Sequence, residues 1–259
     1  MEVVVVATPE DTGRVLADAV EQAVRGGARL LGLATGSSPL AGYRELARRH
    51  REEGLSLAGL DAVLLDEYVG LAADHPQSYA RTIRAALVDH VDLDPARVHG
   101  PDGAAADVLV EARRYDDLVR DLGPVDLQVL GIGANGHLGF NEPGSSLASR
   151  TRVKTLAAGT RRDNARFFAD GEEVPVHVIT QGLGTIRDAR HLVLTASGEH
   201  KAAAVAAAVE GPLTASCPAS VLQLHPHVTV VVDEAAASSL AMVEHYRHVL
   251  AHKPAQQGY

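Results

Sequence analysis

The chain has 259 residues and a mass of 27.2 kDa, with 46% hydrophobic and 22% charged residues. These proportions are those of an ordinary globular protein, and they exclude a disordered or fibrous chain. The net charge of −9 argues against non-specific binding to nucleic acids or anionic membranes, so an anionic substrate would need a locally positive site. The single cysteine, Cys217, excludes an intrachain disulfide. Because no apolar run suits a signal peptide or a membrane span, the sequence predicts a cytoplasmic protein.

Short aliphatic runs alternate along the chain with longer amphipathic stretches. The pattern predicts a strand at 3–6, a helix capped by Thr8 and ended by Gly26, a strand at 29–34, and a helix from the TGSSP turn to about residue 50. A strand at 62–66 and helices at 78–88 and 104–122 follow. A strand at 125–130 runs into a glycine-rich loop, and a short strand at 152–156 precedes a polar helical stretch ending near 170. The last elements are strands at 176–180 and 192–196, a helix at 201–209, a strand at 228–232 and a helix at 234–250.

Strands that alternate with helices are typical of a parallel sheet covered on both faces. The predicted fold class is α/β, a single Rossmann-like domain with a mainly parallel sheet and helices on both of its faces. This domain spans residues 1–251, and a polar C-terminal tail spans 252–259. Ligands of such sheets bind beyond the carboxyl ends of the strands. We therefore expect the functional site in the loops that follow Ala34, Leu65, Leu130 and Ala196.

Two of these loops carry groups suited to binding an anion. In the first, free backbone N–H groups, hydroxyls and a helix dipole form a cradle from Thr35, Gly36, Ser37 and Ser38. In the loop 197–201, Lys201 stands at the start of a helix, where its charge opposes the helix dipole. Binding an anion would explain a lysine at that position, and Arg166 is a second candidate for the same anion.

The other two loops carry groups suited to acid–base chemistry. Asp66 and Glu67 follow a strand, and a regular strand would point them to opposite faces. The glycine-rich loop 131–143 contains His137, which exchanges protons near neutral pH. Glu142 is close enough in sequence to orient His137, and Asn135 is a neutral alternative for that partner.

Two further patterns are discounted. His225 and His227 have a spacing that could suit a metal, but no nearby set of Cys, Asp or Glu completes a zinc site, so no metal is predicted. The glycine-rich loop begins like a dinucleotide fingerprint, but the helix that should follow is missing, so no nucleotide cofactor is predicted.

Seven blocks of sequence stand in a specific order: TGSSP, LLDEYVGL, HPQSY, GIGANGHLGFNEPGSSLASRTRVKTL, NARFF, SGEHKA and LQLHP. Over about residues 34–234 they resemble the isomerising glucosamine-6-phosphate deaminase family. The resemblance implies that glucosamine 6-phosphate and water become fructose 6-phosphate and ammonium, by ring opening, aldose–ketose isomerisation and deamination. It implies no metal and no organic cofactor, and it implies that the segment from Leu156 to about Asp170 is a mobile lid.

The resemblance also assigns roles to the candidate residues. Asp66 is implied as the base that moves a proton from C2 to C1, His137 as the ring-opening group and Glu142 as its orienting carboxylate. The phosphate site is implied for Thr35, Gly36, Ser37, Ser38, Arg166 and Lys201. One position departs from the family, because Asn135 stands where many members carry an Asp that forms a triad with the histidine and the glutamate. Asn135 adds no charge, so its own role is in question.

Four residues match the positions that bind the activator N-acetylglucosamine 6-phosphate in hexameric members of the family: Ser145, Ser146, Arg152 and Lys154. They imply a homo-oligomer, specifically a hexamer. They also imply that this activator regulates it. Two alternatives remain. A 6-phosphogluconolactonase would share the fold and similar loops, but lacks the DEYVGL and FNEPGSSLASRTR blocks. A non-catalytic sugar-phosphate sensor is disfavoured by the presence of Asp66, His137 and Glu142.

Overall fold

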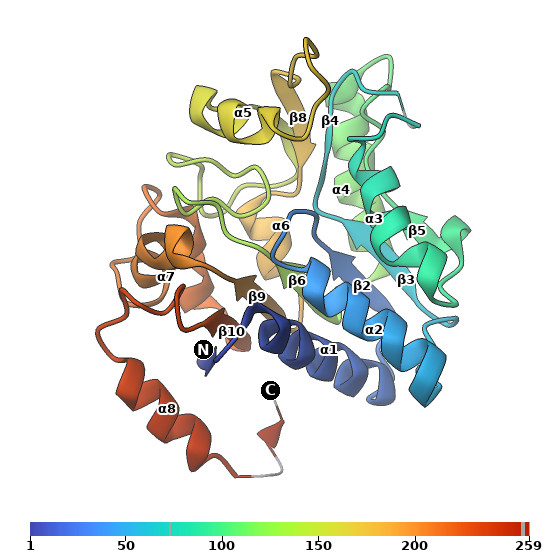
Figure 1. Ribbon diagram of the computed structural model, residues 1–259. Helices are drawn as coiled ribbons and strands as arrows, with labels where there is room; N and C mark the ends of the chain where they lie inside the picture. The colour runs from blue at the N-terminus through green and yellow to red at the C-terminus, as the bar shows by residue number, and fades with distance from the viewer. Residues whose placement is uncertain (73, 255–256, 259) are drawn as a thin grey trace.

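A parallel β-sheet forms the centre of the molecule (Figure 1). The computed structural model describes residues 1–72, 74–254 and 257–258, and in this part of the chain the sheet has seven strands in the order β1-β10-β9-β6-β2-β3-β5. Every neighbouring pair is parallel. The prediction of a single Rossmann-like α/β domain with a mainly parallel sheet is confirmed. The strands are β1 (Glu2–Val6), β2 (Leu30–Leu33), β3 (Asp61–Leu64), β5 (Val98–His99), β6 (Leu127–Leu130), β9 (Leu192–Ala196) and β10 (Val228–Asp233).

Helices cover this sheet on both faces. In Figure 1, α1 and α2 lie side by side in front of the strands, and α4 and α6 lie behind them. Within the described residues, no helix is both long and apolar enough to span a membrane. The helices are α1 (Pro9–Arg25), α2 (Leu40–Glu53), α3 (Tyr79–Ala86), α4 (Val108–Leu122), α5 (Ala158–Ala165), α6 (Leu183–Arg187), α7 (Ala202–Val209) and α8 (Val243–Ala251).

The first helix shows how local sequence sets an element's boundaries. The Thr8 hydroxyl accepts a hydrogen bond from the Asp11 backbone N–H at 3.1 Å, and a proline occupies the first helical position. The helix ends at Gly26, as predicted. Leu16 and Val20 lie one helical turn apart and are both fully buried, because this face of α1 packs on the sheet.

A second, smaller sheet rises beyond the carboxyl ends of the parallel strands, near the top of Figure 1. It is antiparallel and in the described residues contains β4 (Asp66–Tyr68), β8 (His177–Thr180) and β7 (Arg152–Thr155). The predicted strand 62–66 is therefore divided between two sheets. The backbone N–H of Leu65 still donates to Leu33 of the parallel sheet, but its carbonyl oxygen accepts from Gln181, and Asp66 then pairs with Thr180.

The predicted helix over 234–250 is wrong in its first half, because α8 begins only at Val243. The Glu210 carboxylate accepts hydrogen bonds from the backbone N–H groups of Ala241 and Met242, at 2.7 and 2.9 Å. A distant acid thus supplies acceptors that helical carbonyls would otherwise provide, and the chain before α8 follows turns instead.

The predicted helix over 104–122 starts four residues late. The Asp107 carboxylate accepts hydrogen bonds from the backbone N–H groups of Leu109 and Val110, so it is the N-cap and α4 begins at Val108. Aspartate is a preferred capping residue, which gives the boundary a local physical cause.

The described part of the C-terminal tail forms an ion pair with the first strand. The Lys253 ammonium lies 2.5 Å from the Glu2 carboxylate of β1. Residues 255, 256 and 259 of the predicted tail lie outside the described residues. The boundary between residues 251 and 252 stays a prediction.

Three histidines gather near the amino ends of β9 and β10. The rings of His191 and His227 stack with 3.7 Å between centroids, and both ring nitrogens of His225 lie within hydrogen-bond distance of carbonyl oxygens. Over the described residues, no three His, Cys, Asp or Glu side chains are grouped so that they could hold a metal ion. Burial, with added repulsion from His227, His225 and Lys253, lowers the pKa of His191 to about 3.

His191 is therefore expected to contribute to acid unfolding. A histidine that is neutral in the fold but titrates near 6.5 when unfolded leaves stability intact above that pH. Below that pH, the free energy of unfolding falls by about 1.4 kcal/mol per pH unit until the pKa of the folded state is reached. His191→Gln should flatten the fall in unfolding temperature between pH 6.5 and 4, whereas His245→Gln, on an exposed face of α8, should not. Thermal unfolding across this pH range measures the difference, and parallel curves for His191→Gln and the wild type would contradict it.

Candidate active site

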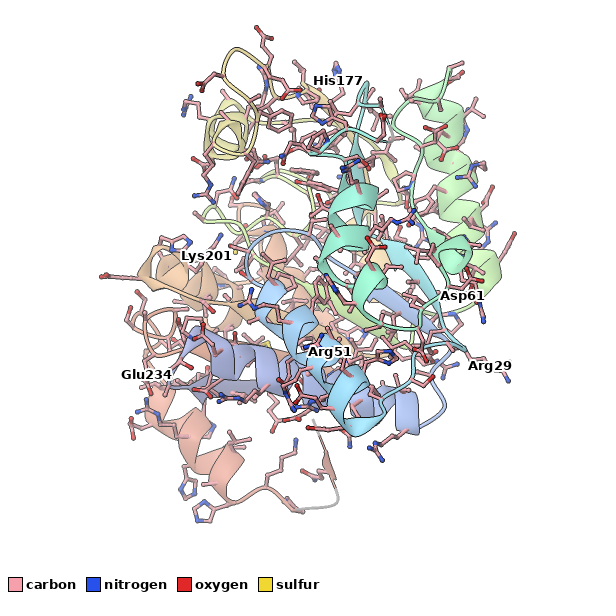
Figure 2. The ribbon with its side chains drawn as sticks, turned by 45° about the vertical axis from the view of Figure 1, so that its right-hand side comes forward. Arg29, Arg51, Asp61, His177, Lys201 and Glu234 are labelled. Atoms are coloured by element: carbon pink, nitrogen blue, oxygen red, sulfur yellow. The ribbon has the colours of Figure 1, made fainter. Side chains whose placement is uncertain are left out.

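The four loops expected to form the site meet around one cavity of about 580 Å³ at the carboxyl ends of the parallel strands. Residues from the loops after β2, β3, β6 and β9 line it, together with residues of α5 and the turns that follow it. Residues 158–172 are called the α5 segment below. Figure 2 shows Lys201 at the start of α7. Arg29 and Asp61, which mark the amino ends of β2 and β3, lie far from it. Of the predicted site residues, the following line the cavity: Thr35, Gly36, Ser37, Ser38, Asp66, His137, Arg166 and Lys201.

Asp66 and Glu67 are separated by the alternation of strand β4. Asp66 faces the cavity, where burial and then the Glu67 charge raise its pKa well above the usual value. The Glu67 carboxylate faces away and accepts four hydrogen bonds of 2.8–3.1 Å, from the Ser78 hydroxyl and from the N–H groups of Tyr68, Tyr79 and Ala80. Glu67 thus fixes the start of α3, and Asp66 is the carboxylate available to a ligand. A buried carboxylate with a raised pKa is suited to act as a general base.

His137 lies on the glycine-rich loop with its ring against the backbone. A Cβ atom at Gly133 would lie 2.3 Å from the imidazole Cε1, so only glycine at that position leaves room for the ring. The His137 Nδ1 lies 3.7 Å from the Glu142 Oε2, which is an ion-pair separation rather than a hydrogen bond. The predicted pairing of His137 with Glu142 is therefore present in the structure, with the histidine at the cavity and the carboxylate behind it.

Both oxygens of the Glu142 carboxylate have neutral donors. The Thr160 hydroxyl donates to Oε1 at 2.5 Å, and the Asn135 side-chain amide donates to Oε2 at 2.8 Å. Burial alone would raise the pKa of Glu142, but the nearby His137 and the hydrogen bonds from Thr160 and Asn135 outweigh burial and lower this pKa to about 2. Glu142 is therefore a fixed negative charge beside His137 across the physiological pH range.

Asn135 has a different partner from the one predicted. Its amide donates to Glu142, and its carbonyl oxygen accepts from the backbone N–H of His137 at 3.2 Å, so it contacts the loop and the carboxylate rather than the imidazole. An asparagine serves Glu142 as a donor, whereas an ionised aspartate there would be a second acceptor. The chain thus supports a charged Glu142 without the additional carboxylate of the family triad.

Asn135→Asp is expected to destabilise the protein increasingly as pH rises from about 5 to 8. Two carboxylates within hydrogen-bond distance share a proton, so the pKa of the pair rises in the fold. A raised carboxyl pKa leaves stability intact at low pH and removes it as pH rises through the folded value. Unfolding temperatures of the variant and wild type at several pH values test this prediction. A difference that is constant with pH would mean that residue 135 does not contact Glu142.

The cavity lining also contains a group of basic side chains. Burial, and then the nearby Arg166 guanidinium, lowers the pKa of Lys201, so these two cations lie close enough to repel each other. Arg162 and His200 also line the cavity, and the loop 35–38 supplies hydroxyls and backbone N–H groups. Two cations held together in an acidic protein favour an anionic ligand between them. This is the kind of locally positive site that an anionic substrate would need in an acidic protein.

The four residues expected to bind an activator lie outside the cavity lining. Arg152 and Lys154 are on β7, and the Arg152 guanidinium donates to the Asn141 side-chain oxygen at 2.9 Å. Burial lowers the pKa of Arg152. The Ser145 side chain is buried and Ser146 is exposed. Their role as a second phosphate site stays a prediction.

Several residues of the cavity lining were not singled out from the sequence. His200 stood within the SGEHK loop, and its position beside Lys201 was the available signal. Tyr79 and Phe140 reach the cavity through long-range packing with Tyr68, which no local pattern reveals. The α5 segment contributes the remainder: Thr160, Arg162, Asp163, Asn164 and Phe167.

The sequence profile described as "Glucosamine-6-phosphate isomerases/6-phosphogluconolactonase" matches residues 7–231. The chain belongs to this family. Among its members, the glucosamine-6-phosphate deaminases of Rhodococcus opacus (strain B4) and Streptomyces coelicolor (strain ATCC BAA-471 / A3(2) / M145) are 60% and 55% identical to it, and each comparison covers 100% of both chains. The resemblance seen in the sequence is confirmed.

Solved structures of the family agree with the fold. A monomeric glucosamine-6-phosphate deaminase has 43% sequence identity and a TM-score of 0.89, over 92% of this chain and 100% of its own. The 6-phosphogluconolactonase from Trypanosoma cruzi has 20% identity and a TM-score of 0.74, over 93% of this chain and 97% of its own. At that identity the lactonase shows a common fold only, so the site rather than the architecture must distinguish the two activities of the family.

Proposed function

We propose that the chain is a glucosamine-6-phosphate deaminase, which converts glucosamine 6-phosphate and water to fructose 6-phosphate and ammonium. The observation that carries this proposal is one cavity whose lining contains both an acid–base pair and two neighbouring cations. Asp66 and His137 supply the first, and Lys201 and Arg166 supply the second. Aldose–ketose isomerisation needs a carboxylate beside C1 and C2, a ring-opening group and a fixed phosphate, and these residues supply all three.

Each residue has one role in this reaction. Asp66 removes the proton from C2 and returns it at C1, because its buried carboxylate binds protons more readily than an exposed one. His137 opens the pyranose ring, and the charged Glu142 behind it fixes and supports the imidazole. Asn135 holds Glu142 in place. The proposal requires no metal and no organic cofactor. Proton transfers between these side chains and the sugar isomerise it, and water then adds at C2 as the C2–N bond breaks and ammonium leaves.

The phosphate of the substrate binds between Lys201, Arg166 and the cradle of Thr35, Gly36, Ser37 and Ser38. The distance from this cradle to Asp66 then selects a sugar of fixed length. The α5 segment overlaps the segment 156–170 proposed as a lid, and it closes over the bound phosphate. A phosphate group that the reaction leaves unchanged is used to position the carbon atoms that react.

An assay of ammonium release from glucosamine 6-phosphate tests the proposal, run beside hydrolysis of 6-phosphogluconolactone. Release of ammonium with stoichiometric fructose 6-phosphate supports the deaminase. Lactone hydrolysis without ammonium would replace it with the lactonase alternative, for which a base at C2 is unnecessary. Binding of the sugar phosphate without turnover of either compound would indicate the sensor.

Regulation and assembly extend the proposal. We infer that Ser145, Ser146, Arg152 and Lys154 bind N-acetylglucosamine 6-phosphate as an activator in a homo-oligomer, specifically a hexamer, that works in the cytoplasm. Light scattering gives the mass, and rates against substrate with and without this compound give the coupling. The 43% identical deaminase is monomeric. A monomer with hyperbolic kinetics unaffected by the compound would overturn the inference for this chain and leave the deaminase proposal intact.

A further inference from the structure

Thr160 links the α5 segment to the charged partner of His137. Helix α5 is short, lacks a side-chain N-cap, and buries only Thr160 among its own residues. That buried hydroxyl donates to the Glu142 Oε1 at 2.5 Å, and Thr160 also lines the cavity. A single hydroxyl therefore joins a mostly exposed helix to the acid–base side of the site.

The same segment also reaches the cationic side of the site. Arg166 caps the C-terminus of α5 and lies near Lys201. Between these two contacts, the Asn164 amide donates to the Tyr68 hydroxyl at 2.8 Å. Beyond them, the Glu172 carboxylate lies 2.6 Å from the His75 Nε2. Any movement of α5 away from the cavity would thus withdraw Arg166 and Thr160 together.

The Glu142 carboxylate depends on both of its neutral donors for its orientation. The terminal torsion of a glutamate is soft, so a carboxylate with one donor can rotate about its last bond. Asn135 holds Oε2 alone, and Oε2 is also the oxygen nearest to the His137 ring. Without the Thr160 hydroxyl on Oε1, the carboxylate would be free to turn its charge away from the imidazole.

We propose that Thr160 is a positioning residue through which the closed position of α5 orients Glu142 and thereby His137, so that capture of the substrate phosphate by Arg166 prepares the ring-opening group. The inference rests on the proposed function and adds a coupling between the two sides of its site. When α5 is open, Glu142 keeps only the hydrogen bond from Asn135. When α5 is closed, the Thr160 hydroxyl supplies the second hydrogen bond. The ring-opening group is then active mainly when a phosphorylated sugar is bound.

Thr160→Val, which removes the hydroxyl and keeps the side-chain shape, tests the proposal. The variant should lower kcat with glucosamine 6-phosphate about tenfold with little change in KM, because the lost interaction acts on chemistry rather than on phosphate binding. The pH–rate profile should also change, because the Glu142 charge beside the imidazole is no longer held in one orientation. Thr160→Ser, which keeps the hydroxyl, should stay within about twofold of the wild type.

Two further variants separate positioning from packing. In a Glu142→Gln background, Thr160→Val should cost much less than tenfold, because the two residues act as a unit. Glu172→Gln, which loosens the far end of the segment, should raise KM without moving the pH–rate profile. Thermal unfolding shows whether each variant folds. If Thr160→Val does not fold, Thr160→Ala replaces it in the same assays.

Three results would overturn the proposal. They are a wild-type kcat and pH–rate profile in Thr160→Val, equal losses in Thr160→Val and Thr160→Ser, or an undiminished loss in the Glu142→Gln background. Each would leave the deaminase activity of the wild type in place. If the wild-type protein itself releases no ammonium, the proposed function fails first, and that result is read before any variant is compared.

Discussion

Asp66→Asn is expected to lower kcat by about 10²–10⁴-fold and to raise the unfolding temperature at neutral pH. The loss of rate follows from removal of the base at C2, since a positioned general base contributes about that factor. Binding of a phosphorylated sugar should change little, because Asp66 is not among the residues proposed to bind the phosphate. A steady-state assay and thermal unfolding of the same preparations measure both effects.

The gain in stability follows from the environment of Asp66. Burial and the Glu67 charge raise the pKa of this carboxyl, so its charged form costs folding energy at neutral pH. A carboxyl with a raised folded pKa leaves stability intact at low pH and removes it as pH rises. The neutral amide of the variant would carry no such cost, so its advantage over the wild type should grow from acidic to alkaline pH. A buried charge that lowers stability at a functional residue is a common exchange of stability for activity.

Glu67→Gln is the matched control for Asp66→Asn. It replaces an acceptor of four hydrogen bonds at the start of α3, so it should lower the unfolding temperature while most turnover remains. The two adjacent carboxylates should therefore show opposite patterns. If Asp66→Asn kept more than a tenth of wild-type activity while Glu67→Gln lost it, the base would be Glu67 instead.

The parts of the fold that sequence predicts are those with local causes. Thr8, Gly26 and the spacing of Leu16 and Val20 determine α1 through capping and one buried face, and each can be identified within a few residues. The position of the site was predictable for a related reason. Parallel strands place their following loops at one edge of the sheet, so Asp66, His137 and Lys201 had to converge there.

The parts that sequence does not predict depend on distant partners. Nothing near Leu65 indicates that the chain leaves the parallel sheet to pair with β8, and Glu210 caps the turn at Ala241 from 31 positions away. The same holds within the site. The residue type at Asn135 indicated a neutral partner for His137, but the folded chain shows that its amide binds Glu142 instead and that Thr160 binds the other oxygen.

Lys201→Met is expected to raise KM for glucosamine 6-phosphate about 10–100-fold with a much smaller effect on kcat. One hydrogen bond to a charged group contributes about 1.5–3 kcal/mol, and the phosphate is unchanged by the reaction. Methionine keeps the apolar stem of the lysine and removes only its charge. Arg166→Gln should raise KM by a similar factor, because both cations serve the same anion. Rates with unphosphorylated glucosamine should be equally low for the variants and the wild type.

The free proteins provide a test of the phosphate site that does not depend on turnover. Burial and Arg166 disfavour the Lys201 charge, so Lys201→Met without ligand should unfold at a higher temperature than the wild type. Inorganic phosphate should reverse this order, because an anion between Lys201 and Arg166 stabilises only a protein that carries both charges. Equal stabilisation of Lys201→Met and the wild type by phosphate would remove Lys201 from the phosphate site. The cradle at Thr35–Ser38 and Arg166 would then have to hold the substrate alone.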